Sequence, residues 1–388
     1  MSDSLIDRVR ERLAAESAPL RSTVVAAAIR AESGGVLGDA EVLSTLRVLD
    51  TELNGAGILE PLLRLPGTTD VLVTSPADVW IDDGNGLRHS GIRFPDEAAV
   101  RRLAQRLAAG AGRRLDDAQP WVDGQLTNAG GGRFTVRLHA VLPPVAAGGT
   151  CLSLRVLRPA TQDLDALSAA GAIAPAAREL LDAMVAARLA FLVSGGTGAG
   201  KTTLLAAALG AVAADERIIC VEDAPELAPL HPHLVRLVAR VPNIEGAGEI
   251  TLRQLVRQAL RMRPDRIVVG EVRGAEVVDL LAALNTGHEG GAGTVHANSP
   301  AEVPARLEAL AALGGLDRAA LHSQLAAGVK ALVHVSRGPR GRCLDEIALL
   351  RRDQNGCCYS MPVWQIDRGM ERDGAESFGR LVSGRLGR

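Results

Sequence analysis

The sequence has 388 residues, which is enough for two domains with short extensions. Its formal net charge of -2 gives the chain no overall attraction to nucleic acid or to an anionic membrane. The five cysteines show no CxxC spacing, so we expect a reducing compartment and no structural zinc. No apolar run is long enough to span a membrane, and residues 1–30 do not have the pattern of a signal peptide. These features predict a cytoplasmic protein that reaches a membrane only through partners.

Residues 1–53 predict a small helical extension, because Leu, Val and Ala recur at helical spacing with Arg and Glu between them. Gly34, Gly35 and Gly38 divide this stretch into separate helices. No residue pattern in it points to chemistry.

Residues 54–158 consist of short alternating segments and predict an α+β domain. A helix is expected at residues 97–109, where Val100, Leu103 and Leu107 share one face. The glycine-rich stretch 128–132 is expected to be a hairpin tip rather than a ligand site. Strands are expected at residues 70–74, 78–81, 87–92, 133–141 and 151–157.

Residues 159–175 mix Pro, Ala, Gly and Asp, and this composition predicts an interdomain linker. In residues 176–366 strands and helices alternate, which predicts an α/β domain with a mainly parallel sheet. Residues 367–388 form a polar tail to which we assign no structure.

A glycine-rich motif in this second domain lies between an apolar strand and an Ala/Leu-rich helix. Its glycines let backbone N–H groups surround a phosphate, and the helix N-terminus adds partial positive charge. Lys201 is one of only two lysines, Lys201 and Lys330, so its place here indicates a need for a compact charge that Arg cannot supply. Thr202 is expected to hold Mg²⁺ through its hydroxyl. The residues expected to bind the nucleotide are Gly195, Gly196, Thr197, Gly198, Ala199, Gly200, Lys201, Thr202 and Thr203.

Three further apolar strands of this domain end in polar side chains, which are Glu222 with Asp223, then Glu271, then His296. The carboxyl ends of parallel strands share one edge of a sheet, and the glycine-rich loop leaves from the same edge. Any one of these side chains alone is compatible with a turn cap. Together with the loop they predict a nucleotide hydrolysis site.

The roles of these residues follow from charge. A carboxylate beside the γ-phosphate is repelled by it, so it is expected either to bind Mg²⁺ or to deprotonate the attacking water. Glu271 is the candidate for the water, because its strand is expected beside the strand that precedes the loop. Glu222 and Asp223 are candidates for binding Mg²⁺ through water. His288 and His296 flank a glycine-rich turn, and each either senses the γ-phosphate or only caps the turn.

These motifs resemble those of the secretion ATPases of the type II/type IV superfamily, and within it the Tad (tight adherence, CpaF-like) pilus branch. The similarity covers about residues 59–350. The tetracysteine zinc module of the type II relatives is absent, which favours the Tad or type IV branch. The matching segments are the Walker A loop, the Asp box at 218–223, the atypical Walker B segment at 267–273, the His box at 287–296, and residues 136–144, 152–155, 242–246 and 261–265.

The resemblance implies a RecA-like P-loop NTPase domain behind a PAS-like N-terminal domain, with ATP and Mg²⁺ in the cleft between them. It also implies a hexameric ring in which Arg137 and Arg155 of the N-terminal domain reach the nucleotide. Arg236 and Arg240 match positions where the family places arginines that cross between subunits. From their spacing alone, Arg236 and Arg240 face either phosphate or a neighbouring subunit. The stretch 128–132 is longer than the family pattern, which leaves the approach of Arg137 open.

The leading hypothesis is an ATP-hydrolysing hexameric motor, held at the inner face of the cytoplasmic membrane by an integral platform protein, that powers pilus or secretion-system assembly. The alternative is a RecA-like motor that translocates nucleic acid. The acidic balance and the scarcity of aromatic residues, with four Phe, three Trp and one Tyr, disfavour this alternative because single strands are bound by stacking. A nucleotide-gated adaptor without turnover is a third hypothesis, and Glu271 argues against it.

Overall fold

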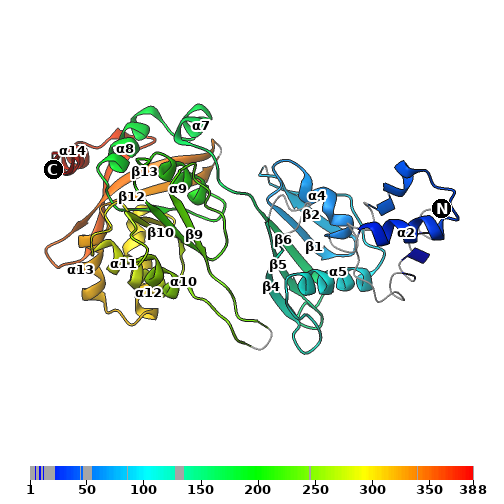
Figure 1. The fold of residues 1–388 in the computed structure, drawn as a ribbon. Coiled ribbons are helices and arrows are strands. Elements are labelled where there is room, and N and C mark those ends of the chain that lie inside the picture. The colour runs from blue at the N-terminus through cyan, green and yellow to red at the C-terminus, as the bar shows by residue number, and fades with distance from the viewer. Residues whose placement is uncertain are drawn as a thin grey trace. The chain divides into compact units, whose positions relative to one another are not determined.

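The computed structural model describes residues 22–43, 45–46, 55–84, 86–126, 135–243, 246–338 and 340–387, together with Leu5, Arg8, Val9 and Arg12. Contacts divide the chain into two units, Met1–Arg158 and Pro159–Arg388 (Figure 1). The stretch 128–132, for which the sequence predicts a hairpin tip, lies outside the described residues.

A small group of apolar side chains packs around helix α2 (Ser22–Glu32) in the N-terminal part of the first unit. The helix is followed by Gly34, whose φ angle of 64° favours glycine. The buried side chains are Val9, Val25, Ala28, Ile29 and Val42.

A six-stranded antiparallel sheet forms the body of the first unit, in the order β3-β2-β1-β6-β5-β4. The sequence pattern predicts each strand except β4. Gly124 takes the place of an apolar side chain on the buried face of β4, because a Cβ atom there would lie 2.9 Å from Cβ of Ala111. The strands are β1 (Asp70–Ser75), β2 (Asp78–Asp82), β3 (Leu87–His89), β4 (Trp121–Leu126), β5 (Thr135–Val141) and β6 (Cys151–Leu157).

Helix α5 (Glu97–Gly110) covers one face of this sheet with the apolar stripe that the sequence predicts, including Val100 and Leu103. It begins at Asp96, whose carboxylate accepts the N–H of Ala99 at 2.7 Å. The short helices η1 (Gly57–Leu59) and α4 (Glu60–Arg64) precede β1. The opposite face of the sheet carries Arg137 and Arg155 together with the exposed side chains of Trp80 and Trp121.

A nine-stranded sheet organises the second unit, in the order β15-β14-β13-β12-β7-β11-β10-β8-β9. The six strands from β12 to β9 are parallel to their neighbours, and β13 to β15 continue the sheet in antiparallel pairing. The strands are β7 (Phe191–Ser194), β8 (Ile218–Glu222), β9 (Leu234–Val238), β10 (Arg266–Val272), β11 (Ala292–Val295), β12 (Ala331–Gly338), β13 (Gly341–Arg352), β14 (Cys358–Gln365) and β15 (Gly369–Met370).

Helices cover both faces of this sheet, as the alternating pattern predicts (Figure 1). One apolar core lies under α7 (Leu164–Ala169), α8 (Pro175–Ala186), α9 (Lys201–Gly210) and α14 (Arg372–Leu386). The other lies under α10 (Leu252–Ala259), α11 (Glu276–Leu284), α12 (Val303–Leu313) and α13 (Arg318–Gly328), with the short helix η2 (Pro300–Glu302) before α12. The α/β fold class predicted from the sequence is confirmed.

Three expectations about this unit differ from the structure. The predicted linker contains α7, and its Leu164, Leu167 and Ile173 are buried in the core of the second unit. The predicted polar tail forms α14, which buries Phe378 in the same core. The strand of Glu271, β10, does not lie beside β7, because β11 pairs between them.

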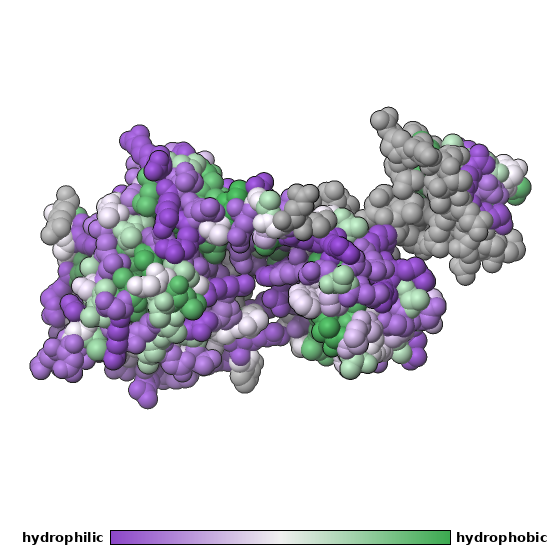
Figure 2. Space-filling view, turned by 90° about the horizontal axis from the view of Figure 1, so that it is seen from below, coloured by the Kyte–Doolittle hydropathy of each residue, from purple (hydrophilic) through white to green (hydrophobic). Residues whose placement is uncertain are grey.

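Hydrophilic residues predominate on the faces of the two units that Figure 2 shows, with hydrophobic residues in small patches between them. Within the described ranges, no helix combines the length and the hydropathy that crossing a membrane requires.

Candidate active site

The glycine loop connects the buried strand β7 to helix α9, which is the order of elements that a P-loop needs. Gly198 and Gly200 have φ angles of 71° and 101°, which glycine adopts without strain. A Cβ atom at Gly195 would lie 2.3 Å from the carbonyl oxygen of Val335 on β12. The loop therefore needs glycine both for its turns and for its close packing against the neighbouring strand.

Lys201 lies in the first turn of α9 and is 8% exposed. Its Nζ donates to the carbonyl oxygens of Gly195 at 3.1 Å and Gly196 at 2.8 Å, and lies 3.4 Å from Nδ1 of His296. Burial lowers the pKa of Lys201, while the carboxylate of Glu271 opposes this change. The ammonium group is thus held inside the loop by carbonyl oxygens that phosphate oxygens can replace.

Glu271 of β10 and His296 after β11 face each other, with Oε1 of Glu271 2.6 Å from Nε2 of His296. Glu271 also pairs with Arg273, whose other terminal nitrogen lies 3.2 Å from Asp223. Burial raises the pKa of Glu271, but the hydrogen bond from Arg273 and the nearby positive charges outweigh burial and lower this pKa. Burial and the charge of Lys201 lower the pKa of His296. At neutral pH an ionised carboxylate and a neutral imidazole therefore stand beside Lys201.

Glu222 ends β8 and is only 2% exposed. Its Oε1 accepts the N–H groups of Glu226 at 3.0 Å and Leu227 at 2.7 Å. Its Oε2 lies 3.6 Å from Nε of Arg236 and has no hydrogen-bond partner among the described residues. Burial raises the pKa of Glu222 to about 7, although these N–H groups and Arg236 act in the other direction. The contacts of Glu222 therefore hold the loop that carries Glu226.

Glu226 brings a carboxylate to the phosphate loop, with its Oε2 3.4 Å from the hydroxyl of Thr202. A hydroxyl beside a carboxylate offers the oxygen ligands that Mg²⁺ prefers, and the other ligands of such an ion commonly come from water and phosphate. These two side chains therefore fit a magnesium ion that arrives with the nucleotide. Asp223, which the sequence predicts for this role, is paired with Arg273.

The hairpin of β12 and β13 holds the phosphate loop from another side. His334 on β12 is 8% exposed, and its Nδ1 lies 3.0 Å from the hydroxyl of Ser194, the residue before the loop. Arg342 on β13 donates from Nε to the carbonyl oxygen of Gly198 at 2.8 Å. The position of the loop thus depends on this hairpin as well as on α9.

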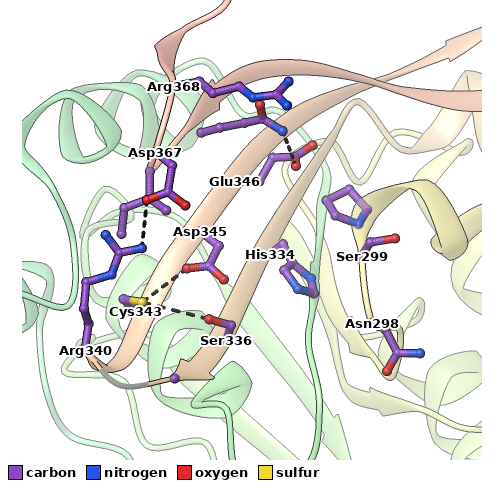
Figure 3. Close-up of a pocket in the computed structure, with 14 residues that line it drawn as sticks. Asn298, Ser299, His334, Ser336, Arg340, Cys343, Asp345, Glu346, Asp367 and Arg368 are labelled. Carbon is purple, nitrogen blue, oxygen red and sulfur yellow. Dashed lines mark hydrogen bonds and ion pairs between the residues drawn. The ribbon is translucent and has the colours of Figure 1, made fainter.

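A pocket of about 470 Å³ lies on the other side of the hairpin (Figure 3). Ser336 of β12 and Cys343 and Asp345 of β13 contribute to its lining, and Sγ of Cys343 lies 3.2 Å from Oδ1 of Asp345. Burial and the Asp345 carboxylate raise the pKa of the Cys343 thiol. Neither Lys201 nor Glu271 lines the pocket, so it is separate from the catalytic cluster.

Three of the predicted nucleotide contacts in the second unit lie away from the phosphate loop. His288 precedes β11, at the opposite edge of the sheet, and its Nδ1 is 3.1 Å from the carbonyl oxygen of Ala283. The structure does not bring His288 to the loop, because the turn that carries it enters β11 instead of leaving it. Arg236 on β9 contacts Glu222, and Arg240 donates to the carbonyl oxygen of Gly248 at 2.7 Å.

Arg137 and Arg155 lie directly opposite each other on β5 and β6 of the first unit. Each is paired with an aspartate, Arg137 with Asp123 at 2.7 Å and Arg155 with Asp70 at 2.9 Å. Both arginines therefore belong to the polar face of the antiparallel sheet.

The sequence patterns assign no role to three charged residues of the site, namely Glu226, Arg342 and Arg273, the last of which ends the matched Walker B segment 267–273. Glu226 and Arg273 follow closely on Glu222 and Glu271, so a search of the strand-end loops for further charges would include them. Arg342 lies 144 positions from Gly198, and the pairing of β12 with β7 brings the two together. No local pattern signals that contact.

A P-loop on a largely parallel sheet, with a buried lysine, an ionised glutamate and a histidine at one edge, defines a nucleotide hydrolase. The family described as Type II/IV secretion system protein matches residues 52–357, and the chain belongs to this family. The chain has a RecA-like P-loop fold and is an ATPase. The superfamily predicted from the sequence is therefore confirmed.

Individual relatives agree with this assignment. A protein of Mycobacterium tuberculosis (strain ATCC 25618 / H37Rv), whose name provisionally assigns it to conjugal transfer, is 76% identical over 341 residues, which cover 88% of this chain and 97% of the relative. A protein of Sinorhizobium fredii named as a probable conjugal transfer protein TrbB is 32% identical over 278 residues, covering 70% of this chain and 80% of the relative. The crystal structure of the pilus retraction motor PilT with bound ADP matches with a TM-score of 0.53 and 22% identity over 76% of this chain and 83% of its own, which supports the fold alone.

Proposed function

We propose that this chain is an ATP-hydrolysing hexameric motor that powers assembly of a Tad-type pilus or a related type II/IV secretion system. The observation that carries the proposal is the cluster of Lys201, Glu271 and His296 around the phosphate loop. An ionised carboxylate close to phosphate groups is repelled by them unless it acts on water or on a metal ion. Glu271 pairs with Arg273 and His296, whereas the proposed metal site consists of Thr202 and Glu226, so water is the proposed target of Glu271.

Each side chain of the cluster has one step to perform. Lys201 exchanges its two carbonyl partners for oxygens of the β- and γ-phosphates. Glu271 takes a proton from the water that attacks the γ-phosphorus. His296, as a neutral imidazole, donates a hydrogen bond to a γ-phosphate oxygen. Arg273 and His296 both contact Glu271, so the attacking water would share the carboxylate with these two side chains.

A magnesium ion bound with ATP would neutralise part of the phosphate charge. Thr202 would hold it through the hydroxyl, and Glu226 would hold it through water. Glu222 supports this arrangement by fixing the loop of Glu226 through two backbone N–H groups.

The hexamer is proposed from the family resemblance together with the position of exposed arginines. Arg240 lies at the base of a segment closed by its pairing with Ile250, where it is open to solvent and available to a neighbouring subunit. Arg137 and Arg155 would exchange their aspartate partners for nucleotide phosphates on assembly. The proposed membrane partner is an integral platform protein at the inner face of the cytoplasmic membrane.

A nucleic-acid motor is the second candidate, because the names of two relatives refer to conjugal transfer. In the first unit Trp80 and Trp121 are 37% and 52% exposed, on the sheet face that carries Arg137 and Arg155. Aromatic and basic side chains together are typical of surfaces that bind single strands. Both arginines are paired with aspartates, however, and are already assigned to the phosphates of ATP in the proposed assembly, so neither is assigned to DNA. We therefore favour a motor that acts on proteins.

The substitution Glu271→Gln tests the proposal. In the 388-residue chain it should leave ATP binding intact and reduce kcat by about 100-fold or more, because general base catalysis contributes about that much. Phosphate release at saturating ATP, with and without Mg²⁺, measures turnover, and titration with a fluorescent nucleotide measures binding. Glu289→Gln is the control, since Glu289 is paired with Arg385 at the opposite edge of the sheet. Hydrolysis by Glu271→Gln at the parent rate would show that another group activates the water.

A further inference from the structure

Successive pairs of side chains on the β12–β13 hairpin face its two sides, the pocket on one side and the phosphate loop on the other. Ser336 and Cys343, directly opposite on the two strands, face the pocket in Figure 3. Side chains alternate along strands, so the next pair, Arg337 and Arg342, faces the other side of the hairpin. The phosphate loop lies on that side, where a Cβ atom at Gly198 would be 4.0 Å from the guanidinium group of Arg337.

Arg342 follows the outer side of the phosphate loop. Its Nε donates to the carbonyl oxygen of Gly198 at 2.8 Å. Its Cδ would lie 3.7 Å from a Cβ atom at Gly200, so the side chain extends past two of the loop's glycines. A hydrogen bond from a charged donor is stronger than one from a neutral donor, which makes this a firm contact for a loop composed mostly of glycine.

The contact fixes the direction of the next N–H group. In a trans peptide the C=O and the N–H point to opposite sides, so the Gly198 carbonyl and the Ala199 N–H cannot both face outward. The Ala199 N–H points to the carbonyl oxygen of Gly196 at 3.4 Å, and the same oxygen accepts Nζ of Lys201 at 2.8 Å. The Ala199 N–H therefore lies on the inner side of the loop, the side on which the ammonium group of Lys201 lies.

We infer that Arg342 is a positioning residue for nucleotide binding: it holds the Gly198 carbonyl outward and thereby keeps the Ala199 N–H directed at the phosphate site. Arg342 acts through the loop and touches neither the attacking water nor Glu271. Its loss should weaken nucleotide binding and leave the hydrolysis step of bound ATP largely unchanged.

The test uses the 388-residue ATPase in the oligomeric state that it adopts in solution. Arg342→Ala should raise both the KM for ATP and the Kd for a fluorescent ADP analogue by up to about tenfold, because nucleotide binding must then order the loop that one hydrogen bond from a charged group otherwise holds. In the same variant kcat should stay within about twofold of the parent value. Arg342→Lys keeps a positive charge but has no planar donor group, so it should raise KM by a smaller factor of about three. Arg340→Ala is the matched control, because Arg340 lies on the same hairpin and pairs with Asp367 at 3.0 Å instead of the loop.

A parent-like KM and Kd in Arg342→Ala would overturn the inference. So would a loss of kcat at unchanged KM, or an equal rise of KM in Arg340→Ala, which would indicate a general effect of surface charge. If Arg342→Ala lowers the unfolding midpoint of the nucleotide-free protein strongly, Arg342→Lys decides the question. A raised KM in that variant at a parent-like midpoint supports positioning, and a parent KM contradicts it.

Discussion

Glu222 and Glu271 end neighbouring strands of one sheet, yet their pKa values move in opposite directions. The hydrogen bond and the charge of Arg273, together with the neighbouring His296 and Lys201, outweigh the burial of Glu271 and lower its pKa. Glu222 has Arg236 at 3.6 Å as its nearest cation, so its burial dominates. Opposite shifts of this kind separate two roles, an ionised carboxylate at the phosphates and a carboxyl group that holds a loop.

The raised pKa of Glu222 predicts a specific dependence of stability on pH. Its pKa is about 7 in the folded chain and close to 4.5 in the unfolded chain, so the folded state binds more protons between these values. The contribution of Glu222 to stability is therefore fully present below about pH 4.5 and is lost as the pH rises through about 7, with a total change of about 3 kcal/mol. Glu222→Gln removes the titration, so its unfolding free energy should gain on that of the parent between pH 5 and pH 8.

Urea unfolding of the nucleotide-free proteins across this pH range measures the difference. Glu226→Gln serves as the comparison, because it changes a carboxylate of the same loop. Parallel stability curves for the parent and Glu222→Gln would mean that Glu222 is ionised throughout.

At the scale of secondary structure, local patterns predicted the buried strands but did not predict which strands lie next to each other in the sheet. Runs of Val and Ile identify β8 and β10, and the short segment before His296 is the predicted strand β11. The order of strands is a tertiary property, which is why the expected neighbour relation between β10 and β7 was wrong. The site survived this error, since every parallel strand brings its carboxyl end to the same edge whatever the order.

Helix α14 could not be predicted from its own sequence, because its order depends on packing against β14 and its residues show little apolar pattern. Its residues are mostly polar, and Phe378 is its main buried side chain. The helix lies against β14, where the Gly374 position comes so close that a Cβ atom would be 1.9 Å from the carbonyl oxygen of Pro362. A glycine that lowers helix propensity thus allows the contact that orders the helix.

This close approach predicts opposite effects for two glycines of one helix. Gly374→Ala should destabilise the second unit by about 2 kcal/mol, because backbone atoms of β14 must move to admit the methyl group. Gly379→Ala should stabilise by about 0.5–1 kcal/mol, since a Cβ atom there meets no atom within 4 Å and alanine favours the helix. Thermal unfolding of both variants beside the parent measures the two signs. Equal effects would show that α14 does not pack on β14 as described.

For the whole molecule, sequence and structure together define an ATPase of a secretion family, and the chemistry of its surface decides between the two proposed cargoes, protein and nucleic acid. The sequence predicted no surface that combines aromatic and basic residues. Folding creates one in part, because β2 and β4 bring Trp80 and Trp121 to the sheet face that carries Arg137 and Arg155. Residues from four strands form this face, so no sequence window contains the pattern.

The effect of DNA on ATP hydrolysis tests whether the proposed motor acts on protein or on nucleic acid. A translocase binds DNA phosphates through basic side chains that lack acidic partners, so its affinity for DNA falls steeply as the salt concentration rises. Here the arginines on the aromatic face are paired with aspartates, so single- or double-stranded DNA should not stimulate ATP hydrolysis at physiological salt. The cytoplasmic part of a cognate platform protein should bind the chain under the same conditions. ATP turnover with and without DNA over a range of salt concentrations, and with Trp121→Ala as the matched variant, is the measurement. The pilus motor would be contradicted by strong DNA stimulation that falls with salt and is lost in Trp121→Ala, without binding to a platform protein. The chain would then be a nucleic-acid translocase. In that case the arginines of this face would exchange their aspartate partners for DNA phosphates, and this exchange would couple DNA binding to ATP hydrolysis.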